Sequence, residues 1–158
     1  AGLMIDAAGN PKVIEFNCRF GDPETQPIML RMQSDLVELC LAGCAGKLDE
    51  KEAVYDSRAA VGVVLAAANY PGEPQKGDVI SGLDADIGAD AKLFQAGTTT
   101  QDGQVVTNGG RVLCATALGN SVLEAQQKAY QLTKLVSWDG IFYRSDIGYR
   151  AIAREQAK

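Results

Sequence analysis

The sequence predicts an α+β fold in two parts: a β-hairpin with a helix, then a small β-barrel or sandwich hybrid that contains one further helix. Two stretches place apolar residues three and four positions apart, which is helical spacing. After residue 59, short apolar segments recur between Gly, Asn and Asp residues, as in small barrels and sandwiches. A charged, turn-like stretch at 47–58 separates the two patterns, so we expect one part at 1–58 and the other at 59–158.

The first part opens with two strand-like segments, residues 2–6 and 12–17, on either side of a turn that contains Gly9 and Asn10. This pattern predicts a hairpin. A two-stranded hairpin is only marginally stable by itself. We therefore expect the rest of its sheet to come from elsewhere, and the 158 residues to be the C-terminal part of a longer protein.

A helix is predicted next, with Thr25 as its N-cap, Pro27 in its first turn and Gly46 at its end. One face of this helix would be apolar, because the following residues step by three and four: Met29, Met32, Leu36, Leu39 and Cys40.

The second part is expected to contain short strands, which the pattern places at residues 61–68, 78–83, 92–98, 104–107 and 111–118. The turn Asn108-Gly109-Gly110 favours a hairpin between the last two. A helix should begin at the capping box of Ser121 and Glu124. The aromatic tail, residues 138–151, is expected to pack back over the strands.

Composition excludes several functions. The net charge is -5 and no basic block is present, which argues against non-specific binding of nucleic acid. No apolar run approaches the roughly 20 residues that cross a bilayer. The chain has no histidine, so Ser-His-Asp and Cys-His catalysis within it and imidazole metal sites are excluded.

The four cysteines show neither a CxxC pair nor zinc-site spacing; they are Cys18, Cys40, Cys44 and Cys114. They fit small buried thiols in a reducing compartment, so the sequence predicts a cytoplasmic protein. A redox pair of Cys40 and Cys44 on one helix face is the weaker alternative.

The second predicted strand carries a candidate metal site. Glu15 and Asn17 are two residues apart and would point to one face, with Cα atoms about 6.6 Å apart. A carboxylate and an amide oxygen so placed can share one hard cation, and Mg²⁺ usually takes only one or two protein ligands. The alternative is the solvated face of a half-buried sheet.

The loop that follows concentrates charged groups at the end of this strand. Arg19 suits a planar carboxylate or a phosphate, because its guanidinium can bind two oxygens at once. Asp22 and Glu24 can hold an ammonium group or cap the next helix. Farther along, Arg111 follows two glycines and is either a phosphate contact or a solvated residue after a turn.

The run EFNCRFGDPETQP, residues 15–27, resembles the C-terminal end of the ATP-grasp domain in the glycinamide ribonucleotide synthetase (phosphoribosylamine–glycine ligase) family. The resemblance extends over essentially the whole chain through SDLVEL (34–39), VVLAA (63–67), YPG (70–72), GGRVL (109–113) and DIGYRAI (146–152).

This resemblance implies an ATP-dependent carbon–nitrogen ligase of de novo purine synthesis. Such an enzyme activates glycine with ATP to a glycyl phosphate and joins it to 5-phosphoribosylamine, releasing ADP and phosphate. Glu15 and Asn17 would hold the Mg²⁺ or Mn²⁺ that bridges the ATP phosphates. Arg19 would stabilise the acyl phosphate or the glycine carboxylate, and Asp22 would bind the substrate amine.

The resemblance also implies that residues 1–58 end an ATP-grasp catalytic domain and that residues 59–158 form the C-terminal domain. Members of the family have further N-terminal domains that hold ATP, and the sequence shows no Gly-rich phosphate loop. We therefore expect those domains as partners, and the chain alone to be inactive. The alternative is a non-catalytic β-barrel binding or carrier module, although neither Lys76 nor Lys92 sits at the tight hairpin tip that a carrier needs.

Overall fold

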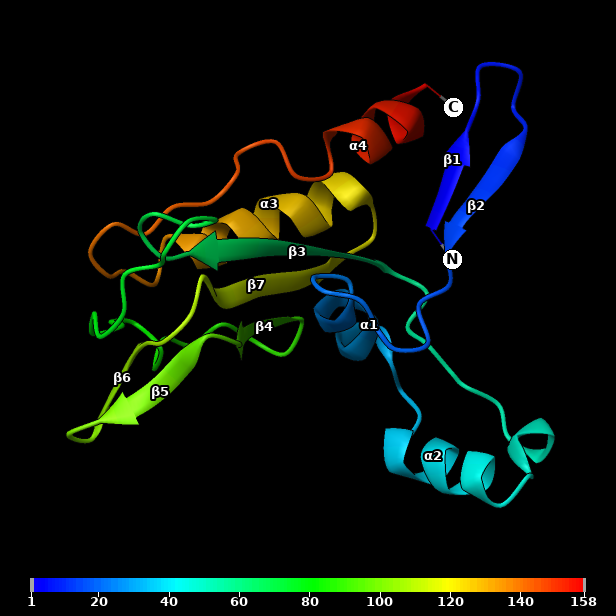
Figure 1. Ribbon diagram of the computed structural model, residues 1–158, viewed down its shortest axis with the longest axis horizontal. Helices are drawn as coiled ribbons and strands as arrows, with labels where there is room; N and C mark the ends of the chain where they lie inside the picture. Colours follow the sequence, from blue (N-terminus) through cyan, green and yellow to red (C-terminus); the bar gives the residue numbers. More distant parts are fainter. Residues whose placement is uncertain (1, 158) are drawn as a thin grey trace.

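The computed structural model describes residues 2–157 and confirms an α+β fold (Figure 1). Over these residues it contains four α-helices and seven strands in three separate sheets, with strand orders β1-β2, β3-β7-β4 and β5-β6. All strand pairs are antiparallel. The three small sheets do not confirm the expected barrel or sandwich.

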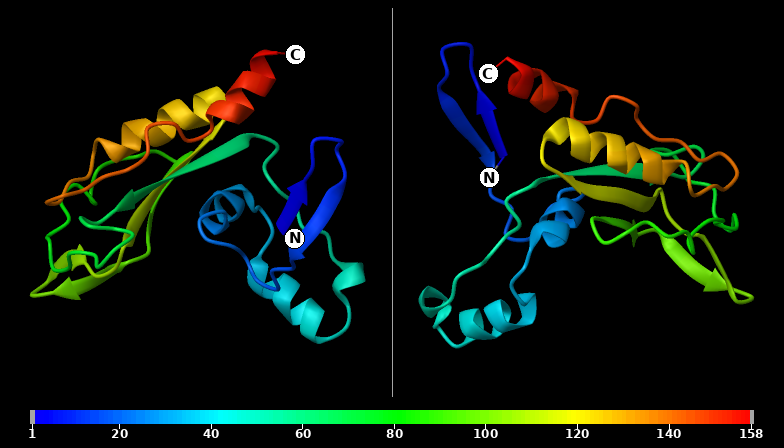
Figure 2. Two further views of the ribbon diagram at one scale, coloured as in Figure 1. Left: turned by 45° about the horizontal axis from the view of Figure 1, so that its top comes forward. Right: turned by 180° about the vertical axis from the view of Figure 1, so that it is seen from behind.

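The core lies between the three-stranded sheet and one helix. The central strand β7 (Arg111–Gly119) pairs with β3 (Ala59–Ala66) and with β4 (Ala91–Gln95). The helix α3 (Val122–Thr133) covers one face of this sheet (Figure 2), and α1 (Thr25–Arg31) packs on β3 and β7 as well. Strand β7 is therefore buried along almost its whole length, as its apolar sequence predicts.

The capping box at the start of α3 is confirmed. The Ser121 hydroxyl oxygen accepts a hydrogen bond from the Glu124 backbone N–H at 3.1 Å, and the Glu124 carboxylate accepts one from the Asn120 N–H at 2.8 Å. Both bonds satisfy donors that a helix start leaves unpaired. The small side chains of Ala125 and Ala129 then face the sheet, fully buried.

The single helix predicted after the hairpin is wrong: the chain forms α1 and a second helix, α2 (Leu36–Cys44). Met32 is extended, and Asp35 caps α2 by accepting hydrogen bonds from the two N–H groups of Val37 and Glu38. The interruption also lets Gln33 donate to the carbonyl of residue 54 at 2.9 Å. The Asp35 cap and the hydrogen bond to residue 54 thus end the first helix, although the apolar spacing favours one continuous helix.

The N-cap prediction for α1 is also wrong. Glu24 occupies the cap position without a side-chain hydrogen bond, and Thr25 is the first helical residue. The Thr25 hydroxyl instead donates to the Gly21 carbonyl oxygen. This bond fastens the preceding loop to the start of the helix.

The predicted hairpin is confirmed as β1 (Gly2–Ile5) and β2 (Pro11–Glu15). The Asp6 carboxylate holds its turn by accepting from the N–H groups of Ala8 and Asn10, both at 2.9 Å. The hairpin projects from the rest of the molecule (Figure 1), and its large apolar side chains are exposed: Leu3, Met4, Ile5, Val13, Ile14 and nearby Phe16.

The hairpin predicted at Asn108-Gly109-Gly110 is wrong, because β6 (Gln104–Thr107) and β7 belong to different sheets. Strand β6 pairs instead with β5 (Thr98–Gln101) through a turn whose Asp102 and Gly103 both have positive φ, 51° and 79°. Asn108 then donates to the Gly97 carbonyl at 2.7 Å. Gly109 therefore lets the backbone pass close to Gly97, and the run does not reverse the chain between two paired strands.

Two other strand predictions need correction. The segment predicted at 92–98 is divided between β4 and β5. The segment predicted at 78–83 forms only isolated bridges, from Val79 to Val106 and from Ser81 to Ser137. Each bridge joins this segment to a different neighbour, so no continuous ladder develops.

The tail packs back on the sheet, as expected. The backbone groups of Phe142 and Ala66 exchange two hydrogen bonds of 2.8 and 3.1 Å, and Trp138 is buried in the core. The last helix, α4 (Tyr149–Gln156), was not predicted; it begins after Gly148, whose φ is +83°, and contacts α3.

Three of the four cysteines contradict the prediction of buried thiols. Cys18, Cys40 and Cys44 are exposed, and only Cys114 is buried. Two of them lie on α2, which extends away from the sheet beside the 3-10 helix η1 (Leu48–Glu50) (Figure 1). At Cys114, burial raises the pKa of the thiol.

Charged side chains fasten the segment between η1 and β3 to the end of α1 and to the residue just before β4. Arg31 donates from Nε and Nη2 to the Asp56 carbonyl at 3.0 and 2.8 Å. Arg58 forms ion pairs with Asp56 at 2.8 Å and with Asp90 at 2.9 Å. Hydrogen bonds from Arg58 lower the pKa of the Asp56 carboxyl from 3.8 to about 2.

We expect Asp56→Asn to weaken the acid sensitivity of the chain. Because the folded-state pKa of Asp56 lies below its ordinary value, its stabilisation is present above pH 3.8 and is lost as the pH falls towards about 2. The free energy of unfolding, measured in urea at pH 5, 3 and 2, should therefore fall more steeply in the wild type than in the variant. Parallel pH curves for the two proteins would contradict this.

No helix in the described residues combines the length and apolar character that crossing a membrane requires.

Candidate functional site

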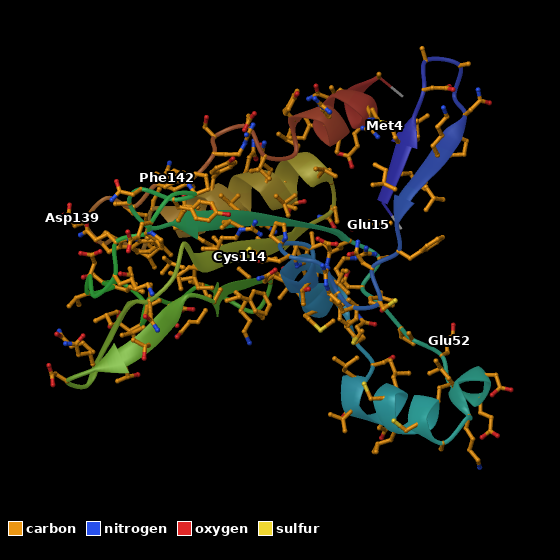
Figure 3. All side chains as sticks on the ribbon, viewed as in Figure 1. Met4, Glu15, Glu52, Cys114, Asp139 and Phe142 are labelled. Carbon is orange, nitrogen blue, oxygen red and sulfur yellow. The ribbon has the colours of Figure 1, made fainter. Side chains whose placement is uncertain are left out.

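A polar hollow of about 570 Å³ opens where the loop after β2 meets the start of β7. Figure 3 shows Glu15 at the end of the hairpin nearest the rest of the molecule. All four residues predicted for the site line this hollow, together with neighbours from the same loop and β7: Glu15, Asn17, Arg19, Phe20, Gly21, Asp22, Glu24 and Arg111.

Glu15 and Asn17 meet, although not through the pleat of one strand. Strand β2 ends at Glu15, so the prediction that it continues to Asn17 is wrong. The Asn17 amide nevertheless donates from Nδ2 to Glu15 Oε1 at 3.3 Å, and both side chains are exposed. Across the hairpin, Gly2 makes room for Glu15: a Cβ there would lie 3.1 Å from Glu15 Cγ.

The donor atoms of this pair suit a hard divalent cation. Turning the Asn17 amide over exchanges its nitrogen and oxygen, and then two oxygen donors face the hollow side by side. One carboxylate and one amide oxygen match what Mg²⁺ or Mn²⁺ takes from a protein when phosphates and water complete the coordination. Within residues 2–157, no group of three or more His, Cys, Asp or Glu side chains gathers in metal-binding geometry.

Arg19 is a positively charged residue that lines the hollow. Its Nη1 donates to the Phe20 carbonyl at 3.3 Å, and within residues 2–157 it forms no ion pair. Its side chain is exposed. The guanidinium is therefore able to receive an anionic group.

Asp22 is already engaged by a cation. Its Oδ2 lies 2.9 Å from Nη1 of Arg111, and its carbonyl oxygen accepts from the same Nη1 at 3.3 Å. The Asp22 side chain is still 66% exposed. A carboxylate has two oxygens, so Oδ1 remains able to accept a hydrogen bond from an ammonium group.

Arg111 is not simply a solvated residue after a turn, because its side chain has two partners. Its Nε donates to the hydroxyl oxygen of Tyr70 at 2.8 Å, and its guanidinium lies over the Tyr70 ring, 5.8 Å from the centroid. The Tyr70 hydroxyl, and then the Asp22 carboxylate, raise the pKa of Arg111. The link to Tyr70 could not be predicted from the sequence, because the two residues are 41 positions apart and no local pattern connects them.

The geometry joins the hairpin, its following loop and the β-rich part in one charged site. The family description "Phosphoribosylglycinamide synthetase, C domain" matches residues 60–150, which is more than half of the chain. The chain belongs to the phosphoribosylglycinamide synthetase family.

Relatives of known sequence and structure agree with this assignment. The phosphoribosylamine–glycine ligase of Vibrio cholerae is 71% identical over all 158 residues, and that of Escherichia coli K12 is 66% identical over 157. The phosphoribosylamine–glycine ligase of Thermotoga maritima has a crystal structure that superposes with a TM-score of 0.79 and 40% identity, covering 92% of this chain and 35% of that one. The chain spans 37% of the length of the two bacterial relatives.

The resemblance to this synthetase family read from the sequence is thereby confirmed. The matched region, 60–150, begins one residue after the start of β3 and takes in nearly all of the sheet, α3 and most of the tail. Arg111 and Tyr70 lie inside that region, whereas Glu15, Asn17 and Asp22 lie before it.

Proposed function

We propose that the chain is part of an ATP-dependent ligase that joins glycine to 5-phosphoribosylamine, forming glycinamide ribonucleotide, ADP and phosphate in de novo purine synthesis. The observation that carries this proposal is the 71% identity over the whole chain to a relative named phosphoribosylamine–glycine ligase. Because that relative is much longer, the proposed partners include the rest of such an enzyme, which would hold ATP.

The proposed enzyme uses two domains of this chain. Residues 1–58 end the ATP-grasp catalytic domain, and residues 59–158 form the C-terminal domain. The start of the family match at residue 60 and the start of β3 at Ala59 support a boundary there. Loop residues before the boundary and Arg111 after it would together line the active site.

The proposed roles follow from the charges around the hollow. Glu15 and Asn17 would hold Mg²⁺ or Mn²⁺, which when bound neutralises charge on the ATP phosphates. Arg19 would donate hydrogen bonds to the glycine carboxylate, or to the phosphoryl oxygens after that carboxylate has displaced ADP from the γ-phosphorus. The Asp22 carboxylate would accept hydrogen bonds from the substrate amine through Oδ1.

The second half of the reaction needs no covalent attachment to the enzyme. The nitrogen of phosphoribosylamine attacks the acyl carbon of glycyl phosphate, and the C–O bond to phosphate breaks. Positioning and charge stabilisation supply the catalysis of such transfers. A chain without histidine is compatible with this chemistry. The free cysteines fit the proposed cytoplasmic location.

The proposal is tested with a chimera in which this chain replaces the matching 158 residues of the Vibrio cholerae relative. ADP release is measured with ATP and phosphoribosylamine, with and without glycine. Release that depends on glycine supports the ligase. Release that ignores glycine reassigns the substrate, and no release favours a binding or carrier module. The isolated chain is the control, and we expect it to be inactive.

A further inference from the structure

Three residues from distant parts of the chain form one continuous set of contacts beside the polar hollow. Tyr70 follows β3, Arg111 begins β7, and Asp22 lies in the loop between β2 and α1. The Arg111 guanidinium stands in the middle, with Nε 2.8 Å from the Tyr70 hydroxyl and Nη1 2.9 Å from the Asp22 carboxylate. The loop that carries Asp22 is thereby linked to the β-rich part.

Backbone hydrogen bonds and close packing hold Tyr70 in place. Its backbone N–H donates to the Ala67 carbonyl at 3.2 Å, within a turn that Gly72 closes by donating to Asn69 at 2.7 Å. Its ring lies directly against Gly110: a Cβ on that residue would overlap Cδ2 of the ring and lie 2.8 Å from Cε2. The glycine before Arg111 therefore allows the ring to reach the guanidinium.

This arrangement fixes the orientation of the Arg111 guanidinium. A guanidinium is planar, so an acceptor on Nε restricts the direction in which Nη1 and Nη2 point. With Nε bound to Tyr70, Nη1 reaches both the Asp22 carboxylate and its carbonyl oxygen. The side chain of Asp22 is 66% exposed, and within residues 2–157 Arg111 is the one partner that orients it.

We propose that Tyr70 is a positioning residue that acts through Arg111 to keep the Asp22 carboxylate at the polar hollow, where it receives the amine of glycine. The amine role of Asp22 rests on the proposed function. Oδ2 of Asp22 is occupied by Arg111, and Oδ1 is left for the ammonium group. Losing the Tyr70 hydroxyl frees the guanidinium and, with it, the direction of the carboxylate.

Tyr70→Phe in the chimera tests this inference, because it keeps the ring and removes only the hydroxyl. We expect the KM for glycine to rise about three- to tenfold, the effect of one hydrogen bond, with kcat and the KM for ATP changed less than twofold. Tyr149→Phe is the matched control: the Tyr149 hydroxyl also accepts from an arginine Nε, that of Arg150 at 2.9 Å, and the Arg150 guanidinium lies over its ring, but Arg150, unlike Arg111, does not line the hollow. It should leave all three constants unchanged.

A double-mutant cycle separates positioning from general loss of structure. Arg111→Lys keeps the charge but loses the planar fork, so it should raise the KM for glycine at least as much as Tyr70→Phe. Adding Tyr70→Phe to it should then have little further effect. A KM for glycine within twofold of the wild type in Tyr70→Phe, a parallel loss of kcat and both KM values, or simple addition of the two effects would overturn the proposal.

An NMR measurement on the 158-residue chain decides the question even where the chimera shows no glycine-dependent turnover, a result that counts against the proposed function. The Nε–H signal of Arg111 is followed in the wild type, Tyr70→Phe and Asp22→Asn. A slowly exchanging signal that shifts in both variants supports the positioning role of Tyr70. A signal that neither variant changes overturns it.

Discussion

Replacing Glu15 by Gln is expected to lower the glycine-dependent ADP release of the chimera by about 10²–10³-fold, the loss typical of removing one group that stabilises charge in a transition state. The substitution keeps the size of the side chain and removes its negative charge, so the paired oxygens of Glu15 and Asn17 lose most of their attraction for a divalent cation. Raising the Mg²⁺ concentration should recover part of the activity, and a Mg²⁺ titration at saturating glycine measures this.

Folding should be little affected by Glu15→Gln. The side chain is exposed and its only hydrogen bond within the described residues is the long one from Asn17. Glu52→Gln is the matched control, because Glu52 is also an exposed glutamate but lies in the segment beyond α2, away from the hollow (Figure 3). Equal activities of the two variants would remove Glu15 from the cation site.

Local signals predicted the parts of the fold whose stabilising contacts are close in sequence. The hairpin was predicted because its turn residues lie between two strand-like segments, and Asp6 indeed holds that turn. The start of α3 was predicted because Ser121 and Glu124 cap it within four residues. In both features the stabilising contacts join residues no more than four positions apart, so the local sequence is enough to predict them.

Competition from distant segments explains the errors. The apolar spacing favours one helix from Thr25 to Gly46, but Asp35 offers a second cap and Gln33 finds a backbone partner at residue 54. The Asn108-Gly109-Gly110 run is used to approach Gly97 closely, which depends on where β4 and β5 run. The Asp35 cap is a local signal that the apolar spacing outweighed, whereas the partners at residue 54 and at Gly97 are not visible in the local pattern.

In the candidate site, too, the residues close in sequence were predicted and the contacts between distant residues were not. The consecutive run containing Glu15, Asn17, Arg19 and Asp22 was recognisable as one motif, and the structure places these residues around one hollow. The support of Asp22 by Arg111 and of Arg111 by Tyr70 spans 89 and 41 residues. Only the three-dimensional structure brings these contacts together, so sequence alone left Arg111 with two interpretations.

Gly82→Ala is expected to be among the most destabilising single substitutions in the β-rich part, with a loss of about 3 kcal/mol or more in the free energy of unfolding. Gly82 has a φ of +84°, which disfavours any side chain. An added Cβ would also overlap the Leu135 carbonyl oxygen and lie 2.9 Å from its carbonyl carbon. Urea unfolding of the 158-residue chain at pH 7 measures the loss.

The backbone around Gly82 has little freedom to relieve that overlap. Next to it, Ser81 and Ser137 exchange two hydrogen bonds of 2.9 and 3.2 Å, so moving either segment breaks them. Gly88→Ala is the matched control: its φ is +70°, but a Cβ there meets nothing within 4 Å. It should cost only about 1 kcal/mol, the penalty of the left-handed backbone alone. Equal losses in the two variants would mean that the segments separate easily and that the Ser81–Ser137 bridge contributes little to the fold.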